Sequence, residues 1–324
     1  MTLLKRLTTR TARLAAIVAA AALSASCINE DLSDCPEDAT VELTYRLHLA
    51  EDGDFLGGQG IDALHLGFWE AGGPLWAEQV VEGADIPDDM TFRLAMPRRD
   101  FAHVAMLNCG DPADGSHTAM PQGIGDVLLT QHQSRRDTVE AMEAPAYTGT
   151  LDLPLSALPA GGTATFDVLL EPRVARLMLN VKYEDGLSNI RCYVDGTAGG
   201  YYPRTGQWLD APGLVVDANA TAAPVGDDEM YYWFYAYPTQ TDGGTRATAQ
   251  QGAEDDSWHV YLYATMPDGT VTQYDFTVTG RPTVAGEVFR AIFVLTDGNG
   301  WSNIGAGVEI DTNWRPGIDI DIEM

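Results

Sequence analysis

The chain has 324 residues, of which 45% are apolar, and it carries 47 acidic but only 19 basic residues, for a formal net charge of −28. The apolar fraction is ordinary for a folded protein, so the composition argues against intrinsic disorder. The acidic excess argues against a nucleic-acid partner, because nucleic-acid binding requires a basic surface, and it favours a solvated body outside the cytoplasm.

The first 26 residues predict a secretory signal peptide. Basic residues precede a short apolar run at 15–22, and small residues then lead directly to Cys27. The apolar run is shorter than the ~20 residues that a membrane-spanning helix needs. The arrangement resembles a bacterial lipoprotein signal, which implies that Cys27 is the lipidated first residue of the mature chain. The alternative is an ordinary signal peptide, cleaved near Ser26, that leaves Cys27 as a thiol.

Residues 27–172 predict a first β-domain. Residues 41–49 alternate apolar and polar side chains over a long stretch, as expected of a half-buried strand. Pro172 cannot donate a hydrogen bond to a sheet, so it marks a strand end and the domain boundary. Residues 137–142 are expected to form one or two helical turns. The further strands expected in this half lie at 61–69, 90–96, 101–109 and 163–170.

Residues 173–324 repeat the pattern and predict a second β-domain. The sequence Pro267-Asp268-Gly269 between two alternating runs predicts a hairpin turn. Short strands separated by turn residues, with almost no helix, predict an all-β chain built from two β-sandwich domains. The strands expected in this half lie at 175–183, 190–194, 230–237, 258–266, 271–278 and 288–295.

The sequence contains no recognisable catalytic or metal-binding motif. There is no GxSxG, no GxxxxGK[ST] and no HExxH, so we predict neither an enzyme nor a cofactor. Residues 297–300 have the alternating oxygen ligands of a calcium loop, but the twelfth position is Val308, so we expect a hairpin turn. The six histidines are expected on polar strand faces: His48, His65, His103, His117, His132 and His259.

Three cysteines follow Cys27, so at most one internal disulfide can form if Cys27 is lipidated. Cys35 precedes the first domain and Cys109 ends one of its strands, and we favour this pair. Cys192 lies on an apolar strand face and is expected to be a buried thiol.

Residues 231–237 contain a dense run of aromatic side chains. In one interpretation Tyr231, Trp233, Tyr235 and Tyr237 form an exposed face that stacks on sugar rings or on a partner. In the interpretation that we favour, residues 232 and 234 fill one face of a sheet, and the remaining aromatic side chains cover its opposite side.

The segment Asp31-Leu32-Ser33-Asp34-Cys35-Pro36, soon after Cys27, resembles the N-terminus of the FimB/Mfa2 family of fimbrial anchor lipoproteins. Segments 41–49, 64–69, 101–108, 145–149 and 170–176 also resemble the family. The resemblance implies two tandem transthyretin-like β-sandwich domains, an outer-membrane lipid anchor at Cys27, other fimbrial subunits as partners, a surface-exposed place at the base of a fimbrium, and no catalysis. The alternative function is a surface glycan-binding lipoprotein, which the aromatic run favours.

The C-terminal residues Ile318, Ile320 and Ile322 alternate with acidic residues. The resemblance suggests that subunits polymerise by strand exchange, so these isoleucines form a candidate donor strand that completes the sheet of a neighbour. Alternatively, the same residues form the closing strand of the second domain's own sheet.

Overall fold

The computed structural model describes residues 40–50, 61–109, 119–211, 213–239, 257–279 and 283–295. The regular elements in these ranges are β-strands and short 3-10 turns, and the all-β fold expected from the sequence is confirmed. None of the described segments holds a helix long and apolar enough to cross a membrane. The 3-10 turns are η3 (Gly83–Asp85), η4 (Ile124–Asp126), η5 (Leu155–Ala157) and η6 (Asn219–Thr221).

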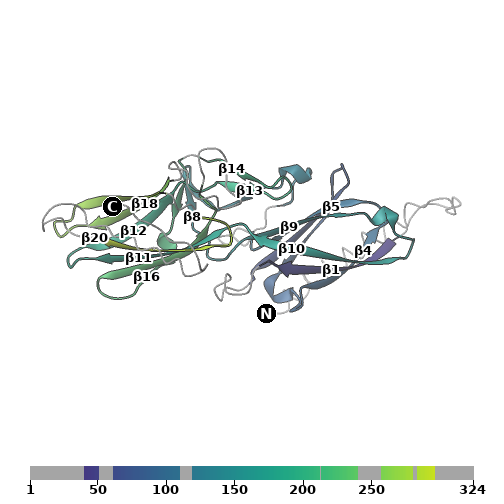
Figure 1. Ribbon diagram of the computed structural model, residues 1–324, viewed down its shortest axis with the longest axis horizontal. Coiled ribbons are helices and arrows are strands. Elements are labelled where there is room, and N and C mark those ends of the chain that lie inside the picture. Colours follow the sequence, from purple (N-terminus) through teal and green to yellow (C-terminus); the bar gives the residue numbers. More distant parts are fainter. Residues whose placement is uncertain are drawn as a thin grey trace, which may run out of the picture. The chain divides into compact units, whose positions relative to one another are not determined.

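The first sandwich consists of seven strands in the order β3-β2-β5-β9-β10-β1-β4. Strand β10 pairs in parallel with β1 along residues 163–170, but it pairs with β9 only at Glu171 and Pro172, so the sheet divides there into two layers (Figure 1). The strands are β1 (Thr40–Leu49), β2 (Ala63–Glu70), β3 (Leu75–Glu82), β4 (Thr91–Pro97), β5 (Phe101–Leu107), β9 (Tyr147–Leu153) and β10 (Thr163–Pro172).

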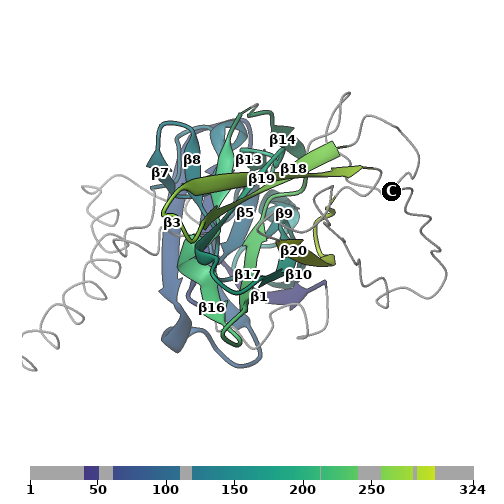
Figure 2. The same cartoon turned by 90° about the vertical axis from the view of Figure 1, so that its left-hand side faces the viewer.

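The second sandwich consists of a four-stranded sheet, β16-β17-β11-β20, and a six-stranded sheet, β19-β18-β12-β15-β8-β7 (Figures 1 and 2). The strands of the first of these sheets are β11 (Ala175–Tyr183), β16 (Ala222–Pro224), β17 (Glu229–Ala236) and β20 (Val288–Leu295). Those of the second are β7 (Gln133–Arg135), β8 (Thr138–Glu140), β12 (Ser188–Asp195), β15 (Val215–Asp217), β18 (Ser257–Thr265) and β19 (Val271–Thr279). A small sheet in the order β14-β13-β6 contains β6 (Leu129–Thr130), β13 (Gly200–Tyr202) and β14 (Gln207–Leu209).

Both sandwiches repeat one pairing. The first long strand, β1 or β11, lies parallel to the last strand, β10 or β20, over eight consecutive residue pairs. The hairpin expected at Pro267-Asp268-Gly269 connects β18 and β19 in antiparallel register. Gly269 has a φ of +85°, and the Asp268 carboxylate accepts a hydrogen bond from the backbone N–H of Thr270 at 2.8 Å. This turn is therefore confirmed.

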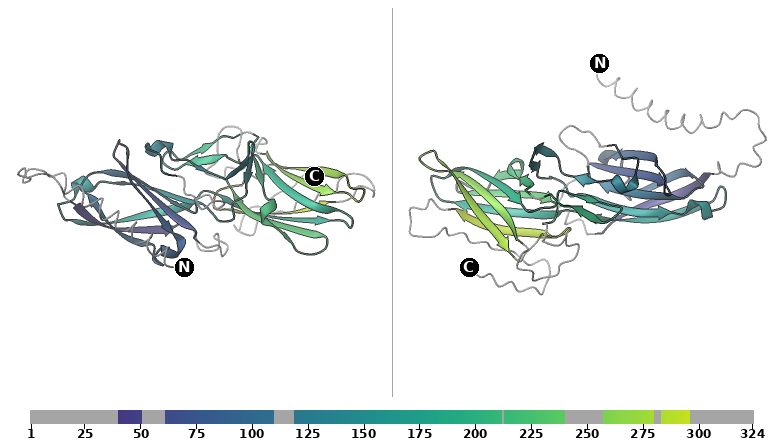
Figure 3. Two further views of the ribbon diagram at one scale, coloured as in Figure 1. Left: turned by 180° about the vertical axis from the view of Figure 1, so that it is seen from behind. Right: turned by 90° about the horizontal axis from the view of Figure 1, so that it is seen from above.

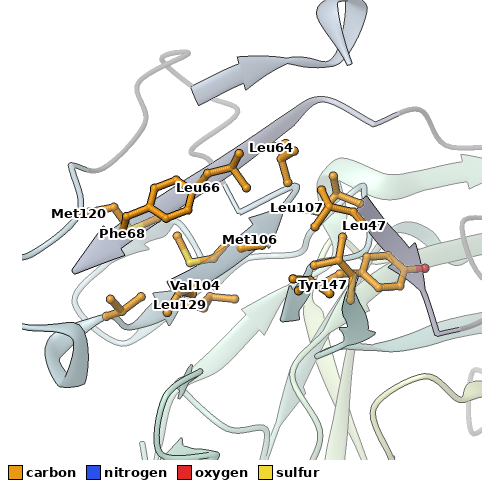
Figure 4. Close-up of a cluster of buried hydrophobic side chains, with 14 of the residues drawn as sticks. Leu47, Leu64, Leu66, Phe68, Val104, Met106, Leu107, Met120, Leu129 and Tyr147 are labelled. Carbon is orange, nitrogen blue, oxygen red and sulfur yellow. The ribbon is translucent and has the colours of Figure 1, made fainter. Parts of the chain in front are cut away.

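The first core fills the space between the layers of the first sandwich (Figure 4). Strands β2 and β5 are covered on both faces, because Phe68 and His103 face β1 whereas Gly67 and Val104 lie on the opposite face, near Met120. The core side chains labelled in Figure 4 are Leu47, Leu64, Leu66, Phe68, Val104, Met106, Leu107, Met120, Leu129 and Tyr147.

The coverage of both faces overturns one expectation. His65 and His103 are buried in the structure, at 5% and 0% exposure, so their expected placement on polar faces is wrong. Alternation along a strand identifies two faces, but it cannot say that a second layer covers the outer one.

Residues 137–142 do not form the helical turns expected from the sequence. Residues 138–140 are strand β8, which pairs in parallel with β15 in the six-stranded sheet. The side chain of Val139 is 4% exposed and packs in the second core. Burial of this one apolar side chain within a sheet outweighs the weak local helix preference of the segment.

A few residues on each side of the expected domain boundary pack in the core of the other sandwich. Val139 and Ala141 pack in the second core, whereas Tyr235 and Tyr237 pack in the first. The division of the chain at residues 172 and 173 stays a prediction.

Candidate interaction surface

Most of the site residues expected from the sequence lie outside the described residues. These are Cys27, Cys35, Ile318, Ile320 and Ile322, together with the calcium-like segment 297–300. The lipid anchor, the disulfide and the donor strand therefore stay predictions.

Cys109 is the one member of the expected disulfide that the structure describes. Its thiol lies 3.1 Å from the Leu107 carbonyl and 3.7 Å from the Tyr147 carbonyl, and burial raises its pKa to about 12. Cys192 is fully buried in the second core, as expected, and burial raises the pKa of its thiol as well.

The aromatic strand β17 divides its side chains between the two cores. Tyr232 and Phe234 fill the second core, which confirms the interpretation that we favoured. Tyr235 and Tyr237 are buried in the first core, so an exposed face of four aromatic side chains does not form. Only Tyr231 and Trp233 of those four are partly accessible.

Tyr231 and Trp233 belong to the outer side of the sheet β16-β17-β11-β20, which we call the cationic face. The other side of this sheet is the wall of the second core. Strand alternation and the pairing registers place on the cationic face Arg176, Met178, Asn180, Lys182, Glu229, Tyr231, Trp233, Val288, Arg290, Ile292 and Val294. Trp233 and Val288 on this face also pack against the first core.

Arginine and aromatic side chains are in contact on the cationic face. The guanidinium carbon of Arg176 lies 5.1 Å from the centroid of the Trp233 ring, within cation–π range. Burial raises the pKa of the Tyr231 hydroxyl, and the positive charges of Arg176 and Arg290 oppose this rise. Three cationic residues, Arg176, Lys182 and Arg290, thus share this face with one acidic residue, Glu229, in a strongly acidic chain.

Two polar atoms of the cationic face are shielded from solvent without a hydrogen-bond partner. They are Nε of Arg176 and Oδ1 of Asn180. The amide nitrogen of Asn180 donates one hydrogen bond to the Glu229 carboxylate at 2.5 Å, whereas its oxygen accepts none. A buried polar atom without a partner costs about 1–3 kcal/mol, so these two atoms lower the stability of the sheet at this position.

No protein-family model and no curated protein sequence matches this chain. Solved structures do match. A "putative adhesin" from Bacteroides ovatus has a TM-score of 0.52 at 12% identity, over 81% of this chain and 93% of its own. The structure of "putative polysaccharide binding proteins (DUF1812)" from Bacteroides thetaiotaomicron has a TM-score of 0.50 at 11% identity, over 80% of this chain and 93% of its own. The fimbrial anchor protein Mfa2 from Porphyromonas gingivalis has a TM-score of 0.47 at 12% identity, over 78% of this chain and 90% of its own.

The chain shares the fold of the two Bacteroides structures. Within the ranges that the structure describes, no three His, Cys, Asp or Glu side chains gather closely enough to hold a metal ion. The chemistry that the cationic face offers is noncovalent, because it combines arginine charge, aromatic rings and unpaired polar atoms.

Proposed function

We propose that this protein is a lipid-anchored fimbrial subunit that attaches a fimbrium to the outer membrane and has no catalytic step. Two observations support the proposal. The sequence leads from a predicted signal peptide into Cys27 and a segment that resembles the fimbrial anchor lipoproteins. The sandwich fold is shared with a structure described as an adhesin. A folded body tethered at its N-terminus is suited to a mechanical attachment, and its partners would be the other subunits of the fimbrium.

The anchor is tested by Cys27→Ser, with Cys35→Ser as the matched control eight residues downstream. Acyl chains on one cysteine are the proposed source of membrane affinity, since each buried CH₂ contributes about 0.8 kcal/mol. We expect the Cys27 variant to leave the membrane fraction or to accumulate as an uncleaved precursor, whereas the Cys35 variant stays in the membrane. A Cys27 variant that matures normally and remains membrane-bound would refute the anchor.

The place in the fimbrium is tested by mechanical shearing of whole cells. We expect the protein to remain with the membrane while the filaments are released, and cells that lack it to shed filaments into the medium. Recovery of the protein along the whole length of sheared filaments would identify it as a shaft subunit.

A surface glycan-binding function is the second candidate, and the contact between Arg176 and Trp233 on the cationic face favours it. Aromatic rings stack on sugars, and an arginine beside them suits an acidic sugar. A glycan array with the protein tests this function. Binding that Trp233→Ala abolishes would support it, provided that Trp76→Ala, at an exposed tryptophan of β3, leaves binding intact. The absence of any bound glycan would leave attachment as the function.

A further inference from the structure

The outer side of strands β12, β18 and β19 carries a group of partly exposed aromatic side chains. The inner side of these strands is a wall of the second core, so alternation along each strand turns the intervening residues outward. Figure 3 shows β18 and β19 in yellow-green as the two strands of one long hairpin. We call the outer side of the three strands the tyrosine face, and its central residues are Arg191, Tyr193, Asp195, His259, Tyr261, Tyr263, Gln273, Asp275 and Thr277.

Carboxylates flank the aromatic rings of the tyrosine face. Tyr261 lies opposite Tyr193 on one neighbouring strand and opposite Asp275 on the other. Beyond Tyr193, the same row across the sheet continues through Asp217 on β15 to Glu140 on β8. From β8 to β19 the row therefore reads Glu-Asp-Tyr-Tyr-Asp, on strands that lie about 4.8 Å apart, and none of these five residues is basic.

The electrostatic potential at the centre of the tyrosine face is negative. The hydroxyl of Tyr261 donates a hydrogen bond to the Asp195 carboxylate at 3.5 Å. Burial, together with the negative charges of Asp195 and Asp275, raises the pKa of the Tyr261 hydroxyl. The basic residue of the face is Arg191, which lies at one end of it, opposite Tyr263. Acidic side chains therefore surround the rings at the centre, and this face favours a positively charged ligand.

The rings of the tyrosine face do not form one flat platform. The ring planes of Tyr193 and Tyr263 meet at 89°, with their centroids 5.6 Å apart. The rings of His259 and Tyr261 are stacked on each other, with their centroids 5.9 Å apart. A sugar chain stacks best along rings that share a plane, whereas a compact cationic group needs only one ring within about 6 Å. The arrangement therefore favours lysine or arginine side chains over a sugar chain.

We propose that the tyrosine face binds a short, extended, basic segment of a partner protein. Charge complementarity supports this occupant, because ammonium and guanidinium groups are attracted both to tyrosine rings and to the carboxylates beside them. Alternate residues of an extended segment lie about 6.7 Å apart, which is also the spacing of residues 259, 261 and 263 along β18. A standard protein interface uses roughly 20–30 residues a side, so this smaller face fits a segment rather than a folded domain. In the proposed attachment function, the partner would be another subunit of the fimbrium.

Calorimetric titration of the purified full-length protein with a short peptide of alternating arginine and threonine residues tests the proposal. The double variant Asp195→Gln/Asp275→Asn should weaken binding about five- to tenfold, and Tyr261→Ala should weaken it about two- to fivefold. The matched control Asp85→Gln/Asp88→Asn removes the same charge from exposed positions between β3 and β4 and should change the affinity less than about twofold. Equal weakening by the two double variants would mean that the peptide only senses net charge, and it would overturn the proposal.

Three further ligands test the chemistry of the partner. One peptide has the same composition with its arginines contiguous, and a second has citrulline, which is uncharged, in place of each arginine. We expect both peptides to bind more weakly than the alternating one. Equal binding of either peptide would overturn the proposal, and so would tighter binding of a glucosamine oligosaccharide.

The aspartate variants keep the test decisive if Tyr261→Ala prevents folding, which circular dichroism would show. The side chain of Asp275 is 53% exposed, so its replacement leaves the second core intact. None of these measurements depends on the membrane anchor, so the binding surface and the attachment function can fail separately.

Discussion

The hydroxyl of Tyr45 on β1 is hydrogen-bonded to Nε2 of His103 on β5, across the first core. The other ring nitrogen, Nδ1, lies 2.7 Å from the Gly67 carbonyl, which can only accept a hydrogen bond. Nδ1 therefore carries a hydrogen, and because burial lowers the pKa of His103 to about 4, the ring is neutral at pH 7 and Tyr45 donates to Nε2. The imidazole also stacks on Phe68 at 4.4 Å between centroids. A polar pair thus links the two layers of the first sandwich at a fully buried position.

The burial of His103 in this pair predicts that the folded protein loses stability in acid. Burial lowers the pKa of His103 from 6.5 to about 4. The unfolded chain binds a proton at His103 below about pH 6.5, whereas the folded chain resists protonation until about pH 4, so stability falls as the pH falls through this window. The loss from this group alone is about 3 kcal/mol. Urea unfolding between pH 7 and pH 4 measures it.

The control for this prediction is a variant that replaces the titrating imidazole of His103 with a side chain that cannot titrate but can form the same hydrogen bonds. In His103→Gln the amide can donate to Gly67 and accept from Tyr45, so the pH dependence of the unfolding free energy should flatten. An equal acid dependence in the His103 variant and the parent would contradict the assignment.

A glycine in β9 is predicted to be irreplaceable. A Cβ atom on Gly149 would lie 2.6 Å from the Leu169 carbonyl oxygen and 2.6 Å from a Val168 methyl group. Because the backbone oxygen cannot move independently, Gly149→Ala should destabilise the first sandwich by about 1–3 kcal/mol. Gly125→Ala is the matched control, since a Cβ there meets no atom within 4 Å. Thermal unfolding of the two variants makes the comparison, and equal melting temperatures would contradict the prediction.

Arg173 is predicted to stabilise the first core at the end of β10. Its Nε donates to the Thr148 hydroxyl at 2.8 Å, it pairs with Glu171 at 2.5 Å, and its guanidinium lies 4.6 Å from the centre of the Tyr201 ring. Arg173→Ala removes all three contacts and should cost about 2 kcal/mol.

The control for Arg173 is Arg204→Ala, which breaks an exposed ion pair to Asp152. Exposed pairs contribute little, so this change should stay within about 0.5 kcal/mol. Denaturant titration of both variants gives the two values. A smaller loss at Arg173 than at Arg204 would mean that the three contacts of Arg173 are dispensable.

The state of each cysteine, bridged or free, can be checked by mass spectrometry. We expect a bridge between Cys35 and Cys109 in peptides from the non-reduced protein. Cys192 should remain a thiol and resist alkylation until the chain unfolds, because it is fully buried and burial raises its pKa. Cys192 in a bridge, or three free thiols, would contradict the pairing.

The sequence predicts the long strands that bury one face against a core. Strands β1, β10 and β11 alternate cleanly, and each lies within a residue or two of its expected position. Strand β3 escapes prediction because it is an edge strand with mostly polar or half-exposed side chains. Strand β9 escapes because its buried positions include Thr148 and Gly149, which carry no hydrophobic signal.

The candidate surface is harder to predict than the strands. Alternation in β17 correctly separates residues 232 and 234 from their neighbours, but Tyr235 and Tyr237 are buried by the first core, which comes from a distant part of the chain. The cationic face combines Arg176 and Arg290, which are far apart in sequence and meet only through the parallel pairing of β11 with β20. Pairing order of this kind cannot be read from local patterns.

The parallel pairing of first and last strands has a mechanical consequence. In the first sandwich the chain enters at Thr40, the start of β1, and leaves at Pro172, the end of its parallel neighbour β10. Tension between these ends acts along the strands in opposite directions. It therefore shears all eight residue pairs at once, whereas a hairpin pulled from its open end would unzip one pair at a time. Under load, the first sandwich resists extension until the whole row of hydrogen bonds between β1 and β10 breaks together.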